Sequence, residues 1–255
     1  MKKLSIDEIN NHLKMGADSY LEDKNILIDN IKNDTSRLYS LNVDVCSYGM
    51  YQFFVKKNIE EAKQYFYLSG KLTVYDILLN NEKLHRPIEE KIAFLLISDN
   101  KKLIEQFSKV RQSTYDSDIK EFLTINPSVQ AILRDDWEHL KELIGYLKYN
   151  VENTRGWKQY QADLMFFESF LEDDSKKMKE AILLLATKYH KRRYDMLLYR
   201  ELIAIPALGY AKLAYIKGYE LDIDNPLIPK ELLPIKPNKE YWDFDFMKEG
   251  VFKDV

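Results

Sequence analysis

Apolar residues recur at intervals of three and four positions along most of the chain, as at Ile88, Ile92, Leu95 and Leu96. Such an interval places the apolar side chains on one face of a helix. Strict alternation of apolar and polar residues, which would indicate strands, is scarce. The pattern therefore predicts an all-α protein.

Several residues have the chemistry of helix starts. Ser5 followed by Glu8 has the form of a capping box, and Asn58 followed by Glu61 resembles one. Pro87 suits a first helical position. Together with the apolar spacing, these signals predict four stacked antiparallel helical hairpins. They pair residues 36–57 with 58–69, 87–97 with 99–111, 119–133 with 136–149, and 156–172 with 174–191.

A last long helical pattern covers residues 194–217. Pro206 lies inside this pattern and lacks the N–H that an interior helical position donates, so it predicts a kink or a restart there. The pattern stops at Gly218, a residue type that commonly follows the last turn of a helix.

The predicted hairpins carry a weak internal repeat, in which an Asp precedes an apolar residue by four positions and a Glu by six. Copies start at Asp99, Asp136 and Asp174, and a looser copy starts at Asn58. An Asp at this place would cap the N–H groups of the second helix. The spacing of about 37 positions lies in the range of stacked helical hairpins. It favours an α-solenoid-like array, with chance alignment of Asp-capped amphipathic helices as the alternative.

After Gly218 the chain changes character, because Pro226, Pro229, Pro234 and Pro237 exclude a long helix. We expect a mostly extended, Pro-rich C-terminal segment with one turn near residues 229–233. The predicted organisation is a helical body, residues 1–218, and an extended acidic and aromatic segment, residues 219–255, packed on that body within a single domain.

The end of this segment, residues 241–246, alternates aromatic and acidic side chains. One interpretation is that the aromatic rings fold back and seal the end of the helical stack. The other is that they bind a basic protein, because Tyr and Trp are frequent interface anchors and carboxylates complement Lys and Arg. Residues 185–218 have a formal charge of +5 and residues 219–255 of −4, so the two segments could also neutralise each other. The candidate partner-binding residues are Asp222, Asp224, Tyr241, Trp242, Asp243 and Asp245.

Composition narrows the class of protein. The 255 residues are 45% hydrophobic with 8 Gly and 7 Pro, which indicates a folded globular chain. The net charge of −3 argues against nucleic acid as the main partner. A short basic run from Lys188 to Arg193 could touch phosphates, although cations at the end of a helix are the simpler explanation.

The single cysteine, Cys46, cannot form an intramolecular disulfide, which fits a reducing cytoplasm. The N-terminus turns polar and acidic where an export signal would be apolar. The uncharged stretch from Leu202 to Ala211 is about half the length that crosses a membrane. These features predict a cytoplasmic protein without a membrane partner.

Candidate chemistry is sparse. The four histidines, at positions 12, 85, 139 and 190, lack metal-ligand spacing, and the common nucleophile and phosphate-binding motifs do not occur. Cys46 suits a buried apolar position better than a reactive one. We expect no catalytic residue, no metal and no cofactor. An alternative is a helical active site in which the basic run and Arg200 hold an anionic substrate beside Glu201 and His190.

Residues 207–218 have the form A-L-x-x-A-x-L-A-x-x-x-G. After an acidic stretch, residues 226–233 have the form P-x-x-P-x-x-L-L. This succession resembles the C-terminal end of the Imm49 family of bacterial immunity proteins. It is also similar, more loosely, to that of the immunity proteins paired with PoNe-type DNase toxins. The resemblance implies an α-helical cytoplasmic protein, encoded beside a polymorphic toxin, which neutralises that toxin by binding and has no catalytic motif.

The sequence therefore predicts an immunity protein that blocks a cognate bacterial toxin by stoichiometric binding. The alternative is a helical-repeat adaptor or regulatory scaffold that binds proteins and has no toxin partner, since stacked hairpins present an extended binding face in either case.

Overall fold

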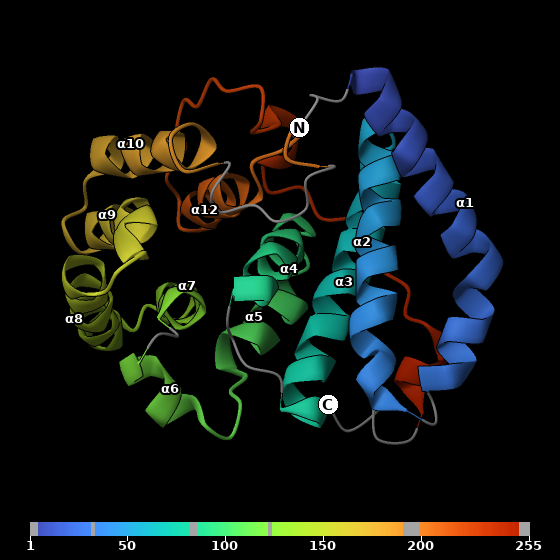
Figure 1. Cartoon of the computed structure of the whole chain (residues 1–255), viewed down its shortest axis with the longest axis horizontal. Helices are drawn as coiled ribbons and strands as arrows, with labels where there is room; N and C mark the ends of the chain where they lie inside the picture. Colours follow the sequence, from blue (N-terminus) through green and yellow to red (C-terminus); the bar gives the residue numbers. More distant parts are fainter. Residues whose placement is uncertain (1–4, 32–33, 82–85, 122–123, 191–198, 250–255) are drawn as a thin grey trace. The chain divides into compact units, whose positions relative to one another are not determined.

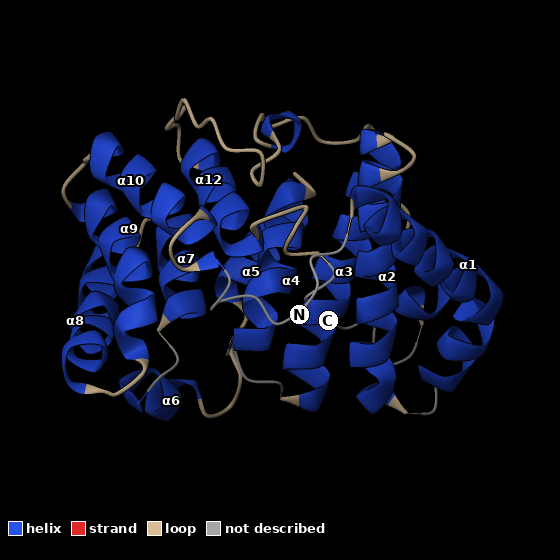
Figure 2. Ribbon diagram, turned by 45° about the horizontal axis from the view of Figure 1, so that its top comes forward, coloured by secondary structure: helices blue, strands red, loops and turns tan. Residues whose placement is uncertain are grey.

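The computed structural model describes residues 5–31, 34–81, 86–121, 124–190 and 199–249. Over these residues the chain forms helices and irregular segments without a strand (Figures 1 and 2). The all-α prediction is confirmed.

The chain divides into two compact units. The first contains Met1–Glu82, Phe94–Gln106 and Lys236–Val255, and the second contains Lys83–Ala93 and Phe107–Ile235. Helices α4 (Arg86–Ile97) and α5 (Lys101–Lys109) contribute residues to both units. The predicted C-terminal segment is also shared, because residues 219–235 belong to the second unit and residues 236–255 to the first. The packing of residues 219–255 on residues 1–218 as one domain stays a prediction.

The first unit is built on three long helices. Helix α1 (Ile6–Ile31) packs on α2 (Leu38–Phe54), and α2 packs on α3 (Ile59–Asn80). A short 3-10 turn, η1 (Thr35–Arg37), precedes α2, and another, η4 (Asp245–Lys248), lies near the C-terminus. The backbone N–H of Ser5 donates to the Glu8 carboxylate, and the Glu8 N–H donates to the Ser5 hydroxyl. This reciprocal pair is the predicted capping box.

The second helix of the first predicted hairpin is longer than expected, since it continues past residue 69 to Asn80. Gly70, which weakens a helix locally, is accommodated because Leu95 packs directly on it. A Cβ at Gly70 would lie 2.8 Å from the Leu95 Cβ. The helix ends at Asn81, whose φ of 54° breaks the helical path.

The second unit is a row of neighbouring helices. Helix α7 packs on α8, α8 on α9, α9 on α10, and α10 on α12 (Figure 1). Two 3-10 turns, η2 and η3, belong to the same unit. The bounds are α6 Tyr115–Glu121, α7 Ile125–Leu133, α8 Trp137–Asn153, η2 Trp157–Tyr160, α9 Gln161–Leu171, α10 Ser175–Ala186, α12 Ile205–Ile216 and η3 Lys230–Leu232.

Four predicted helices of this unit are shorter than expected. The helix predicted over 174–191 ends at Ala186, where the chain turns. Residues 119–133 form parts of two helices, α6 and α7, because Pro127 is tolerated only in a first helical turn. Residues 156–172 begin with the 3-10 turn η2. The pattern over 194–217 becomes a helix only from Ile205, so Pro206 marks a restart. Its first residues, 194–198, lie outside the described residues.

The internal repeat corresponds to a recurring hairpin corner. At each of four corners one residue has a left-handed backbone, with φ between 52° and 60°, and the next residue caps the following helix. The left-handed residues are Lys57, Asp99, Asp135 and Asp173. The capping oxygens belong to Asn58, Asn100, Asp136 and Asp174.

The predicted caps at Asp136 and Asp174 are thus confirmed, whereas the cap predicted at Asp99 is wrong. Asn100 performs that role by accepting from the Leu103 N–H at 2.9 Å. The Asp99 carboxylate instead accepts from the Lys63 ammonium at 2.5 Å, and both side chains are buried. Asp99 has the left-handed backbone of its corner, with a φ of 60°, and so lies one position before the cap, as Asp135 and Asp173 do. Its carboxylate is free of the capping role and compensates the buried lysine.

Candidate protein-binding surfaces

The C-terminal residues 241–246 lie along α3 in the first unit. The Tyr241 ring is centred 4.8 Å from the Tyr67 ring, and its hydroxyl donates to the Ser98 carbonyl. The Trp242 backbone pairs with the Gln64 amide, whose nitrogen donates to the Trp242 carbonyl at 2.8 Å and whose oxygen accepts from its N–H at 3.1 Å. This segment therefore folds back onto the helices, as one of the two interpretations predicts.

Asp243 is engaged inside the same unit. Its carboxylate accepts from the Tyr67 hydroxyl at 2.7 Å and from the Lys71 ammonium at 2.6 Å. Burial, together with the hydrogen bond to Asp243, raises the pKa of the Tyr67 phenol. Phe244 and Phe246 are buried and stack with ring centroids 5.8 Å apart. The alternation of residues 241–246 thus places Phe244 and Phe246 in the interior of the unit. We call residues 238–248 the C-terminal strap.

Four of the six predicted partner-binding side chains stay exposed. Trp242 is 45% exposed, with its ring against Tyr65. The Asp245 side chain is 90% exposed near Lys248, and that of Asp224 is 94% exposed near Lys230. Asp222 is also exposed. Asp222 and Asp224 belong to the second unit, and residues 241–245 belong to the first. That these residues bind a partner stays a prediction.

Lysines of the basic segment are used for tertiary contacts. Lys212 is fully buried, and its ammonium donates to three carbonyls at 3.0 Å each. The carbonyls belong to Leu232, Leu233 and Pro234. Lys212 therefore holds the chain at and after η3 against α12.

The residues of the alternative active site have a structural arrangement. His190 is buried, and its Nε2 lies 2.5 Å from the Arg200 carbonyl. The Arg200 guanidinium lies 3.6 Å from the Glu201 carboxylate. Lys191, Arg192 and Arg193 of the basic run lie outside the described residues. Over the part of the chain that is described, no group of three or more metal-binding side chains occurs, and no helix is long and apolar enough to span a membrane.

A second titratable cluster links α6 and α8. The Tyr115 hydroxyl lies 3.1 Å from His139 Nε2, and His139 Nδ1 lies 3.3 Å from the Glu142 carboxylate. Burial raises the pKa of Tyr115 to about 12. A phenol that binds its proton so firmly is a poor acid near neutral pH. The observed role of the cluster is to connect α6, through Tyr115, with α8, through His139.

Sequence reasoning missed a surface at the hairpin corners of the second unit. Trp137 begins α8 and is 38% exposed, although its ring stacks on Phe170 with centroids 6.5 Å apart. The Lys217 ammonium lies 5.9 Å from the same ring and 2.5 Å from the Asp135 carboxylate. Three chain segments thus meet around one tryptophan.

The neighbouring corner joins the same arrangement. The Tyr219 ring packs edge-on against Phe170 at 5.6 Å, and its hydroxyl donates to Asp173 at 2.6 Å. Leu171, at the end of α9, is exposed. We call these residues the corner surface: Asp135, Trp137, Leu171, Asp173, Lys217 and Tyr219. The sequence signal that could have found it is a tryptophan placed directly after two corner aspartates.

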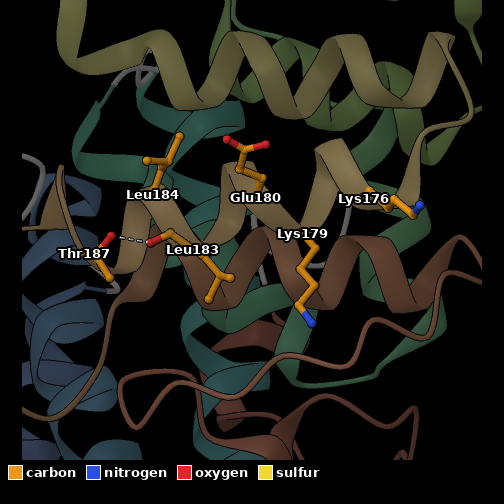
Figure 3. A pocket seen from close by; sticks show the side chains of 6 residues that line it. All are labelled: Lys176, Lys179, Glu180, Leu183, Leu184 and Thr187. Carbon is orange, nitrogen blue, oxygen red and sulfur yellow. Dashed lines mark hydrogen bonds between the residues drawn. The ribbon is translucent and has the colours of Figure 1, made fainter.

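A shallow groove of about 320 Å³ runs along α10 (Figure 3). The Thr187 hydroxyl donates to the Leu183 carbonyl at its end. The side chains that line it are Lys176, Lys179, Glu180, Leu183, Leu184 and Thr187. Five of them come from α10, Thr187 follows its last residue, and their charges are mixed, so the groove favours no particular ligand.

The described residues thus define an all-α protein with exposed aromatic and charged side chains at its helical corners. Residues 130–232 match the family model of Imm49, immunity protein 49. This segment, which is less than half of the chain, is similar to that family. Comparison with curated proteins and with solved structures finds no significant match.

The matched segment bears directly on the candidate surfaces. It begins in α7, ends at Leu232 of η3, and contains the whole corner surface. Residues 241–246 lie outside it. The resemblance inferred from residues 207–233 is confirmed, and the family segment extends further toward the N-terminus than those motifs.

Proposed function

We propose that this chain neutralises a cognate bacterial toxin in the cytoplasm by stoichiometric binding. The observation that carries the proposal is the Imm49 match over residues 130–232, because the family is one of immunity proteins. The proposed mode of action is occlusion, in which a stable complex covers a surface that the toxin needs. Catalysis by the immunity protein has no part in this mechanism.

The fold gives this mechanism a physical basis. Binding costs less conformational entropy when the side chains of the binding surface are already ordered in the free protein. Capped corners at Asp136 and Asp174 fix the starts of α8 and α10, and the buried Lys212 fixes the chain after η3. A helical scaffold that is held at its corners can therefore offer a preorganised face to a toxin.

The test is co-expression with the toxic polypeptide encoded beside this gene. We expect cells to survive only when the intact chain is present, and we expect a one-to-one complex by size-exclusion chromatography with light scattering. A toxin from an unrelated system is the control, and it should neither be bound nor neutralised. Continued killing by the neighbouring toxin in the presence of soluble, folded chain would contradict the proposal and favour the adaptor alternative.

A further inference from the structure

We propose that the corner surface, built around Trp137, binds a face of the toxin that is rich in Lys and Arg. This inference rests on the proposed function and names the surface through which it operates. It concerns the second unit only, and it differs from the set predicted from the sequence, which is Asp222, Asp224, Tyr241, Trp242, Asp243 and Asp245.

The first argument is the state of Trp137. A tryptophan side chain that is 38% exposed leaves a large apolar area in water. Its ring is nevertheless held by Phe170 and by the Lys217 ammonium, so little conformational freedom is left to lose on binding. Leu171, which follows Phe170 at the end of α9, is also exposed. Exposed, ordered tryptophans are the commonest anchors of protein interfaces.

The second argument concerns the left-handed aspartates at the two corners. Asp135 and Asp173 have φ values of 57° and 52°, a conformation that costs energy for residues other than glycine. They are not the caps, since Asp136 and Asp174 fill that role. Lys57 occupies the equivalent position of another corner, so the corner geometry does not require a carboxylate. Within the chain they accept from the Lys217 ammonium and the Tyr219 hydroxyl, yet both aspartates stay exposed. The two carboxylates are therefore ordered and accessible to the cations of a partner.

The third argument is charge. Residues 134–138 and 172–174 contain six carboxylates and one arginine. The nearby Lys176, Lys177 and Lys217 offset part of this charge, since Lys217 pairs with Asp135 and Lys177 with Glu172, and a formal excess of two carboxylates remains. Carboxylates around an apolar centre complement a basic face, speed its association and reject acidic proteins.

The fourth argument is position, because the Imm49 match contains every residue of the corner surface and excludes residues 241–246. If the immunity function belongs to the matched segment, its binding surface is expected there. Within that segment, the corner surface combines an exposed aromatic ring with two exposed carboxylates, whereas the side chains of the α10 groove include no aromatic ring.

The experiment measures affinity for the toxic domain encoded beside this gene, used in an inactivated form, by isothermal titration at low and at high salt. One variant combines Asp135→Asn with Asp173→Asn, because asparagine tolerates the left-handed backbone and keeps an oxygen acceptor for Lys217 and Tyr219. The other variant is Trp137→Ala. Thermal unfolding of each variant shows whether the fold is kept.

We expect Trp137→Ala to weaken binding at least about tenfold. The double Asn variant should weaken binding several-fold at low salt and less at high salt, because ions screen the lost charges. The controls are Trp242→Ala, which removes a tryptophan of similar exposure outside the matched segment, and Asp245→Asn, which removes an exposed carboxylate there. Both controls should bind like the unaltered chain.

The outcomes separate the two proposals. If the unaltered chain binds the toxin and both corner variants bind equally well, the corner surface is wrong and the proposed function stands. Loss of binding in Trp242→Ala or Asp245→Asn alone would assign the site to the C-terminal strap instead. If the unaltered chain does not bind the neighbouring toxin, the proposed function fails and the corner surface fails with it.

Discussion

Two glycines in helix interiors occupy opposite environments. In α8, a Cβ built on Gly145 meets no atom within 4 Å, so nothing in the packing requires glycine there. In α12, a Cβ built on Gly209 would lie 2.8 Å from the Ala93 Cβ and 3.3 Å from its Cα. Gly209 lies in the motif that resembles Imm49, and its lack of a side chain lets α12 approach α4.

We therefore predict that Gly145→Ala and Gly209→Ala change stability in opposite directions. Gly145→Ala should raise the free energy of unfolding by about 0.5–1 kcal/mol, because alanine loses less backbone entropy in a helix. Gly209→Ala should lower it by about 1–3 kcal/mol, because the Ala93 backbone cannot move aside at little cost. Urea unfolding followed by circular dichroism measures both. A Gly209→Ala chain as stable as the original would show that α12 and α4 are not in close contact.

At the scale of elements, the C-terminal strap is a structural part of the first unit. Asn238 donates to the Glu60 carbonyl, Trp242 pairs with Gln64, and Asp243 binds Lys71. These contacts follow the length of α3 from its first turn. The strap therefore connects α3 with a segment that lies more than 150 positions later in the sequence.

Ending the chain at Glu240 should destabilise the first unit. The deletion removes the buried Phe244, Phe246 and Met247, and burying each such side chain contributes roughly 1.5–3 kcal/mol. We expect the free energy of unfolding to fall by about 3 kcal/mol or more, measured by urea unfolding. Asp245→Asn in the full chain is the control, and its stability should not change. A truncated chain with unaltered stability would mean that the strap does not hold α3.

At the scale of the whole molecule, buried tyrosines occur in both units. Burial raises the pKa of Tyr75 in the first unit to about 12, and it does the same for Tyr115 in the second. The unfolded value is 10. The fold favours the neutral form of both phenols over the ionised form. The two tyrosines therefore contribute their full stabilisation of the folded state below pH 10. Their contribution is lost as the pH rises through about 12.

We therefore predict that both units unfold together with tyrosine ionisation between about pH 10 and 12. Helix content by circular dichroism and tyrosinate absorbance, recorded on the same sample, should change over the same interval. Tyr149, which is 67% exposed, provides the control, since Tyr149→Phe should leave the transition where it is. Ionisation of all tyrosines without loss of helix would disprove the role of buried phenols in alkaline stability.

Local sequence determined much of this protein. The helical periodicity, the capping box at Ser5 and Glu8, the caps at Asp136 and Asp174, and the restart at Pro206 depend on hydrogen bonds within a few residues. Such bonds are decided by neighbouring residue types, so they can be inferred before the fold is known. The resemblance of residues 207–233 to Imm49 was also present in the sequence itself.

Tertiary structure decided what depends on residues distant in the sequence. Asp99 has the sequence environment of a cap, yet it pairs with Lys63 because a buried ammonium needs a carboxylate. Asp243 has the composition of a surface acid, yet Tyr67 and Lys71 bind it within the fold. Trp137 resembles a core residue, yet it is left partly exposed at a corner. Local patterns fix where helices begin and end, whereas burial and ion pairing between distant residues decide which side chains are available to a partner.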